Sequence, residues 1–445
     1  MNITRRNFLK TSPALAAAIA VPSLRTTGST RNTRVSANDK INVALIGCNN
    51  MGWYNLTDHL IHEEIRCVAL CDIDKTVLET RTADVIKLKG VRPEQYGDYR
   101  KILDRKDVDI VIIGTPDHWH CLQFVDSCAA GKDVYVEKPI ANSIAECDAM
   151  VAAAKRYDRV VQVGQQQRSS GHWQQMIEYL RSGKLGVIGH AHIWANFNYA
   201  AIPQRIPDSA VPEGVDFETW IGPTPKVTFN SQRFHRKWRM FWNYGGGLLT
   251  DWGVHLLDMG LWGLDVKKMP NKIVAAGGNF FYPDGAQETY DSQTVSYLFD
   301  DVVMSWEHNA GVEKGPYNRS YGVMFKGTNG TLVADRESWE IYPEWDNQNN
   351  APKMSELIVK ADHKDHKTHV KNFIDCVKTR NKQTACTIEN GSLCAKYAHL
   401  GNISARLGGE SLFYDDEKRL FKDNREADKL LKPSYRKPWI FPGGV

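Results

Sequence analysis

Three residues that lie far apart in the sequence have side chains suited to proton transfer and to stabilising an oxygen anion. Asp251 and His255 are four positions apart, so on a helix they share one face and reach the same pocket. Histidine suits removal of a hydroxyl proton near neutral pH, and a cation such as Lys138 stabilises the developing alkoxide. Taken singly, Lys138 is equally consistent with a solvated surface lysine and His255 with a core histidine. Together they indicate oxidation of an alcohol.

A glycine turn near residue 50 predicts a dinucleotide site. The apolar run Ile41–Gly47 reads as a buried parallel strand. It ends in a turn and then a helix, the arrangement in which a pyrophosphate rests on a helix N-terminus. Asn49 replaces the middle glycine of the usual pattern, and asparagine tolerates a left-handed backbone. The residues expected to contact the cofactor are Gly47, Asn49, Asn50, Met51 and Gly52.

An acidic residue follows at the position expected for ribose recognition. The second strand ends at Asp72, twenty positions after Gly52, where a carboxylate accepts bonds from the adenosine ribose hydroxyls. An acid there repels a 2′-phosphate, which favours NAD over NADP. The alternative is that Asp72 caps the following helix, and Asp74 is the second candidate for the ribose.

Further strands alternate with helices and extend the predicted site. Apolar runs at 108–120 and 132–140 fit a parallel, doubly wound sheet, and ligands bind beyond the carboxyl ends of such strands. The residues at those ends, predicted to contact the cofactor, are Thr115, Pro116, Asp117, His120, Glu137 and Lys138.

The pattern changes after about residue 188. Alternating strands there suit an open, largely antiparallel sheet. The fold class expected is α/β, with an N-terminal Rossmann domain (40–168), a C-terminal α+β domain for substrate and oligomerisation (169–400) and a tail (401–445).

Residues 199–243 are rich in Pro, Trp, Arg and His and are longer than a connector requires. We expect them to line the substrate site. The candidate substrate contacts are Arg168, His235, Arg236, Trp238 and Tyr244, although Arg168 fits an interdomain salt bridge equally well. Further along the chain, His363, His366 and His369 have no carboxylate or Cys partner at metal spacing, so no metal site is predicted.

The first forty residues have the pattern of a targeting signal followed by a linker. The segment TRRNFLK is similar to a twin-arginine export signal, with a short apolar run and a small-residue cleavage site at Ala18–Ala20. A short amphipathic helix is the alternative for this stretch. We expect a signal peptide over 1–22, a linker over 23–39 and a periplasmic protein.

The nine cysteines form no CxxC pair and have apolar neighbours, so they read as buried free thiols, consistent with a chain that folds before export.

Composition excludes two classes of protein. Of 445 residues, 56 are basic and 52 acidic, a balance that argues against a dedicated nucleic-acid binder. No apolar run approaches the roughly 20 residues of a membrane-spanning helix, so stable membrane insertion is not expected.

Several motifs together resemble one enzyme family. The turn GCNNMG, TPDHWH, AGKDVYVEKPIA and GGGLLTDWGVHLLDMGLW occur in the order and approximate spacing of the Gfo/Idh/MocA oxidoreductases, over the chain from about residue 40 to the final hundred residues. The resemblance implies that Lys138 polarises the reacting oxygen, that His255 is the general acid/base and that Asp251 orients it or holds substrate. It also implies an NAD cofactor, a sugar or glycoside substrate and a homo-oligomer.

The function expected is therefore an exported, NAD-dependent oxidoreductase acting on a secondary hydroxyl of a sugar or glycoside, with NAD tightly bound and recycled in place. The first alternative is a glycosidase that uses NAD transiently, by oxidation and elimination. The second is a non-catalytic sugar- or NAD-binding protein, although Lys138, Asp251 and His255 are all present.

Overall fold

A six-stranded parallel sheet forms the N-terminal half of the computed structural model, which describes residues 40–197 and 202–444. The predicted signal and linker lie outside the described residues. The strand order is β3-β2-β1-β4-β5-β6, and every neighbouring pair is parallel. The strands are β1 (Ile41–Ile46), β2 (Ile65–Cys71), β3 (Glu94–Tyr96), β4 (Ile110–Ile113), β5 (Asp133–Val136) and β6 (Val161–Val163).

The local sequence explains why these elements begin and end where they do. Strand β4 is buried along its whole length, as a strand covered on both faces must be. Helix α2 (Lys75–Lys89) starts where the Asp74 side chain accepts from two main-chain N–H groups. It ends at Gly90, which adopts the left-handed conformation that glycine tolerates best.

An eight-stranded sheet forms the second half. Its order is β16-β13-β12-β11-β7-β10-β9-β8, and all neighbouring pairs are antiparallel except β7 with β10. The prediction of an α/β fold with a parallel Rossmann sheet and a largely antiparallel second sheet is confirmed. The strands are β7 (Ile188–Ala195), β8 (Lys272–Gly278), β9 (Ser292–Leu298), β10 (Val303–Asn309), β11 (Tyr321–Gly327), β12 (Gly330–Ala334), β13 (Ser338–Pro343) and β16 (Leu357–Lys360). Two short hairpins add β14 (Trp345–Asp346) with β15 (Ala351–Pro352), and β17 (Tyr414–Asp415) with β18 (Leu420–Phe421).

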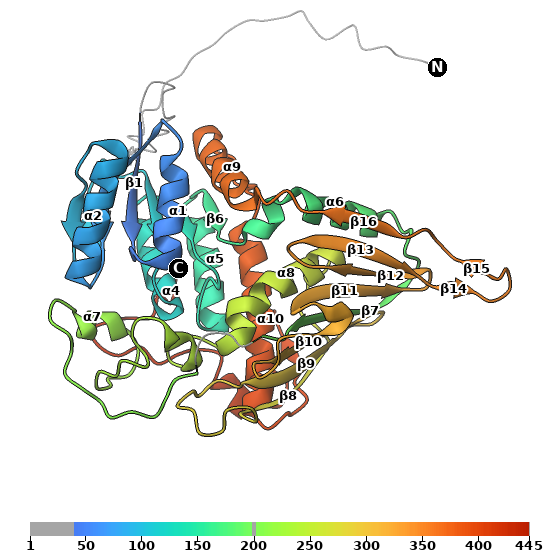
Figure 1. Cartoon of the computed structure of the whole chain (residues 1–445). Helices are drawn as coiled ribbons and strands as arrows, with labels where there is room; N and C mark the ends of the chain where they lie inside the picture. The colour runs from blue at the N-terminus through green and yellow to red at the C-terminus, as the bar shows by residue number, and fades with distance from the viewer. Residues whose placement is uncertain (1–39, 198–201, 445) are drawn as a thin grey trace, which may run out of the picture. The chain divides into compact units, whose positions relative to one another are not determined.

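Helices join the two sheets. Figure 1 shows α8 (Val254–Gly263) and α10 (Ile388–Arg406) between the parallel strands and the eight-stranded sheet. Both helices are buried along most of their length because they are covered on two sides. The remaining helices are α1 (Asn50–Leu60), α3 (Arg100–Leu103), α4 (Asp117–Ala129), α5 (Ile144–Arg156), α6 (Gly171–Arg181), α7 (Phe217–Ile221), α9 (Asp365–Thr379) and α11 (Arg425–Asp428). Short helical turns are η1 (Gln166–Ser169), η2 (Lys237–Met240), η3 (Leu249–Gly253) and η4 (Pro316–Asn318).

The irregular stretch before α8 has a core of its own. Its buried residues are mostly aromatic and pack together over α7 and η2. They are Phe217, Trp220, Ile221, Phe229, Phe234, Trp238, Met240, Phe241 and Tyr244. Each large apolar side chain buried in this way contributes about 1.5–3 kcal/mol. This internal core gives the segment a defined shape without long secondary structure.

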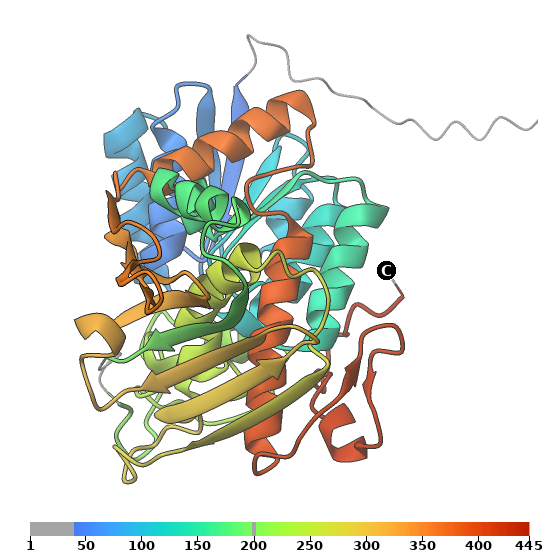
Figure 2. The ribbon, with the colours of Figure 1, turned by 90° about the vertical axis from the view of Figure 1, so that its right-hand side faces the viewer.

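The C-terminal end of the chain packs back on the first domain. Helix α10 runs through the predicted boundary at residue 400, and the chain after it returns to lie beside α5 (Figure 2). There Tyr435 donates from Oη to Glu146 at 2.6 Å, and the Trp439 ring packs edge-on against Trp119. This end of the chain therefore contributes to the core of the nucleotide domain.

All nine cysteines are buried and unpaired, as their apolar neighbours predict. Burial raises the pKa of the Cys67 thiol to about 12, so it is protonated at neutral pH. Among the described helices, none has both the length and the apolar character required to cross a bilayer.

Candidate active site

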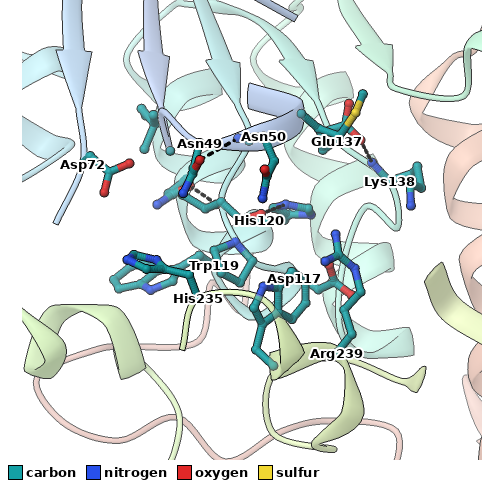
Figure 3. Close-up of a pocket in the computed structure, with 18 of the residues that line it drawn as sticks. Asn49, Asn50, Asp72, Asp117, Trp119, His120, Glu137, Lys138, His235 and Arg239 are labelled. Carbon is teal, nitrogen blue, oxygen red and sulfur yellow. Dashed lines mark hydrogen bonds between the residues drawn. The ribbon is translucent and has the colours of Figure 1, made fainter. Parts of the chain in front are cut away.

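A cavity of about 580 Å³ lies at the carboxyl ends of the parallel strands, where the two domains meet. In Figure 3 the strands point toward it from one side, and the segment carrying His235 and Arg239 closes it from the other. The predicted residues that line it are Gly47, Asn49, Asn50, Met51, Asp72, Thr115, Pro116, Asp117, His120, Glu137, Lys138, His235, Arg236, Trp238, Asp251 and His255. Gly52, Arg168 and Tyr244 are not among its lining residues.

Three glycines make the dinucleotide turn possible. Gly47 has a φ of +83°, and a Cβ on Gly52 would lie 2.0 Å from the Gly47 carbonyl oxygen. A Cβ on Gly114, at the end of β4, would lie 2.4 Å from the Gly52 Cα. The first turn of α1 therefore packs directly on the neighbouring strand, which leaves room above it for a ligand. Gly52 serves this packing rather than the cavity wall.

The left-handed residue of the turn is Asn50, whereas the prediction gave that conformation to Asn49. Asn49 has an extended backbone (φ −99°), so it is not the left-handed residue. It precedes α1, and its side chain accepts from the Asn50 N–H at 3.0 Å. Asn50 instead has the positive φ, +38°. The N-terminus of α1 still faces the cavity, as binding of a pyrophosphate requires.

The sequence left open whether Asp72 contacts the ribose or caps the following helix, and the structure shows that Asp74 is the cap. Asp74 caps α2, accepting from the N–H groups of Thr76 and Val77. Asp72 lines the cavity, and its two oxygens accept from the Cys48 and Asp74 N–H groups at 2.8 and 3.0 Å. Burial raises the pKa of Asp72, while these bonds favour its ionised form. Of the two acids, only Asp72 therefore lines the cavity.

The other predicted cofactor residues surround the middle of the cavity. Thr115 Oγ1 donates to Gln123 at 2.7 Å, and Pro116 precedes α4. The His120 ring bridges the carbonyls of Thr115 and Pro139, and burial lowers its pKa to about 4. Glu137 accepts from Asn55 Nδ2 at 2.8 Å. These contacts hold the three strand ends in fixed positions.

Lys138 and Asp251 meet across the domain junction. Lys138 Nζ donates to Asp251 Oδ1 at 2.6 Å and to the Asp251 carbonyl at 3.1 Å. Arg239 Nε lies 3.1 Å from the same carboxylate oxygen. Asp251 is thus held between two cations, one from each side of the cavity.

The four-residue spacing of Asp251 and His255 predicted a regular helix, but the segment that carries them is only partly regular. Leu249–Gly253 is a π-helical turn, and α8 begins directly after it. Both side chains nevertheless line the cavity. Such turns occur frequently at functional sites because they widen the helix locally.

The surroundings of His255 favour its neutral form. Burial, and then the nearby cations Lys138 and Arg336, lower its pKa well below the ordinary 6.5. The imidazole is therefore neutral near neutral pH and able to take up a proton. Its Nδ1 is buried without a hydrogen-bond partner among the described residues, as expected where a ligand completes the site.

The candidate substrate residues separate into three groups. Trp238 and Arg236 line the cavity. His235 also lines it, but its Nε2 lies 2.9 Å from Asp74 Oδ2, so it sits at the end of the cavity that Asp72 lines. Arg168 makes a two-pronged ion pair with Asp258, the alternative that the sequence left open. Tyr244 is buried in the aromatic core of the preceding segment.

The three histidines of the 363–369 stretch do not converge. His366 pairs with Asp58, His369 contacts Ser169 and the Val163 carbonyl, and His363 lies near Glu337 on the surface. In the part of the chain that the structure describes, no group of three or more His, Cys, Asp or Glu side chains has the arrangement of a metal site.

Sequence reasoning missed several residues of the cavity wall, among them Gly114, Arg239, Trp252 and Arg336. Gly114 precedes TPDHWH directly, and a third glycine after a strand was an available signal. Arg239 and Arg336 carried no motif. Arg239 stacks over Trp238 at 4.1 Å and Arg336 over Trp252 at 4.5 Å.

Comparison with known protein families agrees with this architecture. Residues 41–165 match the oxidoreductase-family NAD-binding Rossmann fold, and residues 186–441 match the oxidoreductase-family C-terminal alpha/beta domain. A glycosyl hydrolase family 109 protein of Shewanella putrefaciens is 28% identical over 208 residues, which cover 42% of this chain and 45% of that protein. The alpha-N-acetylgalactosaminidase of Shewanella oneidensis is 25% identical over 206 residues, with the same coverage. The matched regions thus span less than half the length of these relatives.

Solved structures share the fold at low sequence identity. The aldose-aldose oxidoreductase from Caulobacter crescentus, complexed with glycerol, has a TM-score of 0.63 and 18% identity, covering 84% of this chain and 99% of that one. The WlbA dehydrogenase from Bordetella pertussis, in complex with NADH and UDP-GlcNAcA, has a TM-score of 0.61 and 17% identity, with the same coverage. With its N-terminal NAD-binding Rossmann domain and its C-terminal alpha/beta domain, the chain belongs to the Gfo/Idh/MocA oxidoreductase family.

Proposed function

We propose that this protein is an exported, NAD-dependent oxidoreductase that acts on a secondary hydroxyl of a sugar or glycoside. The observation that carries the proposal is the convergence of Lys138, Asp251 and His255 at the strand ends of an NAD-binding domain. Export rests on the paired arginines and apolar run of residues 1–22.

The residues divide the work of oxidation. Bound NAD supplies the acceptor for the hydride that leaves the carbinol carbon. Lys138, held by Asp251, places positive charge beside the oxygen as it becomes an alkoxide. His255, neutral at the working pH, takes the hydroxyl proton. The sugar thereby loses one hydride and one proton and becomes a keto sugar.

The structure supports tight binding of NAD because a segment of the second domain covers the ribose end of the site. Main-chain bonds join Lys75 to Gly214 at 3.0 Å and Asp216 to Ile73 at 2.9 Å. His235 adds its contact with Asp74. A dinucleotide enclosed beneath these contacts leaves slowly.

Retention of NAD fits a protein working where no soluble nicotinamide pool is at hand. The hydride and proton taken from one sugar would then be returned to a second, keto sugar, so that the cofactor undergoes no net change. Mass spectrometry of the denatured, purified protein tests this: we expect NAD or NADH in near-stoichiometric amount. Purified protein free of nicotinamide dinucleotide would exclude the recycling mechanism.

A panel of mono- and disaccharides tests the reaction itself. We expect at least one sugar to reduce the bound cofactor and to accumulate as a keto sugar when a second carbonyl compound is supplied. If no member is oxidised or reduced while sugars still bind, a binding protein becomes the better account.

A second candidate reaction is suggested by the relatives. The matched Shewanella proteins are glycosyl hydrolase family 109 members, one of them an alpha-N-acetylgalactosaminidase. In such a reaction, oxidation of a glycoside to its ketone would acidify the adjacent C–H, and loss of that proton would expel the aglycone. Addition of water to the unsaturated ketone and return of the hydride would then give the free sugar and restore NAD. Lys138 and His255 would serve the oxidation and the final reduction. Release of phenol from a nitrophenyl glycoside would indicate this reaction, whereas keto-glycoside formation with the glycosidic bond intact would indicate a dehydrogenase.

A further inference from the structure

Arg336 occupies a fixed position in the wall of the cavity. It follows β12 in a turn that is closed by the Asp335 N–H donating to the Ser338 carbonyl at 2.9 Å. The Asp335 side chain accepts from the N–H groups of Glu337 and Ser338 within the same turn. The Arg336 guanidinium then stacks over the Trp252 ring at 4.5 Å. The arginine is therefore held in place by its own turn and by an aromatic face.

The charge of Arg336 is not neutralised by a carboxylate. Among the described residues no acidic group lies within 4.0 Å of it, and Nε is buried without a partner. Within the described part of the chain it makes one hydrogen bond, from Nη2 to Gln167 Oε1, and this bond is long at 3.4 Å. The neighbouring Asp335 is committed elsewhere, since its Oδ2 pairs with Arg319 at 2.9 Å. Asp251, the nearest acid of the reaction site, is held by Lys138 and Arg239.

Other buried arginines show what is unusual here. Arg168 is paired on both prongs with Asp258, and Arg319 is paired with Asp335 and Glu340. A buried cation is costly unless it is paired. Arg336 departs from this rule, and Gln167 beside it has a buried Nε2 that also lacks a partner in the described structure. Of these two residues, only Arg336 lines the cavity.

The contact with Gln167, taken with the sheet order, places Arg336 at the reacting end of the cavity. Asp72 follows β2 on one side of β1, whereas Lys138 follows β5, two strands away on the other side. Neighbouring strands are about 4.8 Å apart, so two strand spacings place Lys138 about 10 Å from the dinucleotide turn that follows β1. Gln167 follows β6, one strand further on. Arg336 also influences the pKa of His255. It therefore belongs to the substrate side, beyond the dinucleotide.

We propose that the substrate is a sugar acid, a hexuronic acid or a uronoside, whose carboxylate binds Arg336 while its reacting hydroxyl faces Lys138 and His255. This inference rests on the proposed oxidoreductase function. A guanidinium fork matches the two oxygens of a carboxylate. Phosphate sites of this fold instead use the N–H groups of a helix N-terminus, and the α1 N-terminus lies across β4 from Lys138.

Calorimetric titration of the NAD-loaded protein tests the proposal with matched ligands: glucuronate against glucose, galacturonate against galactose, and glucose 6-phosphate. We expect each uronate to bind about 10- to 150-fold more tightly than its neutral twin, the value of one hydrogen bond to a charged group. Arg336→Gln should abolish that preference and Arg336→Lys should retain part of it. Arg181→Gln, an exposed arginine of α6 outside the cavity, is the matched control and should retain all of it.

Three results would overturn the carboxylate site. They are equal binding of uronates and neutral sugars (including no binding of either), preference for glucose 6-phosphate, and an Arg336→Gln variant that weakens both members of a pair by the same factor. Failure of the proposed function is separately visible. Uronate binding that depends on Arg336, without any reduction of the bound nicotinamide, would retain the site and reject the oxidoreductase.

Discussion

Lys138 joins the two domains through Asp251: Nζ donates to Oδ1 at 2.6 Å, with both side chains less than a tenth exposed. One residue follows the fifth strand of the parallel sheet, and the other lies in the π-helical turn before α8. Because each ion is buried and paired, the contact fixes the lysine at the domain junction. It also means that the reacting end of the cavity exists only when both domains are in place.

Replacing Lys138 with Met should slow oxidation by about 10²–10³, the usual contribution of one positioned charge in the transition state. NAD should remain bound, because Asp72 and the α1 turn are untouched. Single-turnover reduction of the bound cofactor measures the rate, and Lys101→Met, an exposed lysine of α3, serves as the control. A Lys138→Met variant with the wild-type rate would remove Lys138 from the mechanism.

The rate of oxidation should depend on pH through His255. Its pKa lies well below 6.5, because of burial first and then of Lys138 and Arg336. The neutral, proton-accepting form therefore persists as the pH falls through 6.5, and the rate should decline only at lower pH. Lys138→Met removes one of these causes, so the acid limb should move to higher pH.

Single-turnover rates across the pH range provide the measurement. An acid limb at or above pH 6.5 in the wild type, or one that does not move in the variant, would argue against His255 as the base. His255→Asn should lower the rate by about 10²–10⁴.

The parts of the cavity wall that the sequence located are those in which the signal is local. The turn at 47–52 and Asp72 follow buried strands directly, and a strand end fixes where the next side chain points. The role of Asp74 as the α2 cap required three-dimensional geometry, because both acids precede the helix.

Residues whose role depends on distant packing could not be assigned in this way. Gly114 must be glycine because of Gly52, more than sixty positions earlier in the chain. In the aromatic segment before α8, no periodicity tells which side chains face the cavity. Arg236, Arg239 and Tyr244 are all plausible there, and the packing of that segment sends Tyr244 inward and Arg239 to Asp251.

His235→Asn should weaken retention of NAD without affecting the reacting end. The contact of His235 with Asp74 helps to hold the covering segment over the ribose site, and both groups are partly exposed. Such pairs are worth about 0.2–1 kcal/mol, so we expect NAD to dissociate at most about fivefold faster. Asp74→Asn, which keeps a capping oxygen for α2, should give a similar increase. The rate of NAD dissociation can be measured after dilution into an enzyme that consumes free NAD, with His363→Asn as an exposed control. Unchanged rates in both variants would mean that the covering segment does not retain NAD.

Replacement by asparagine should affect stability very differently at two acids of the same cavity. Burial above all raises the pKa of Asp117 well above its ordinary value, against the opposing effect of Arg239, and so favours the protonated carboxyl. An amide imitates a protonated carboxyl, and Asp117→Asn should change the free energy of unfolding by less than about 1 kcal/mol. Asp251→Asn instead leaves Lys138 and Arg239 without their shared anion, which should cost about 3–5 kcal/mol. Urea unfolding of both variants decides the matter: equal losses would show that Asp117 is ionised and that the charge of the site is distributed differently.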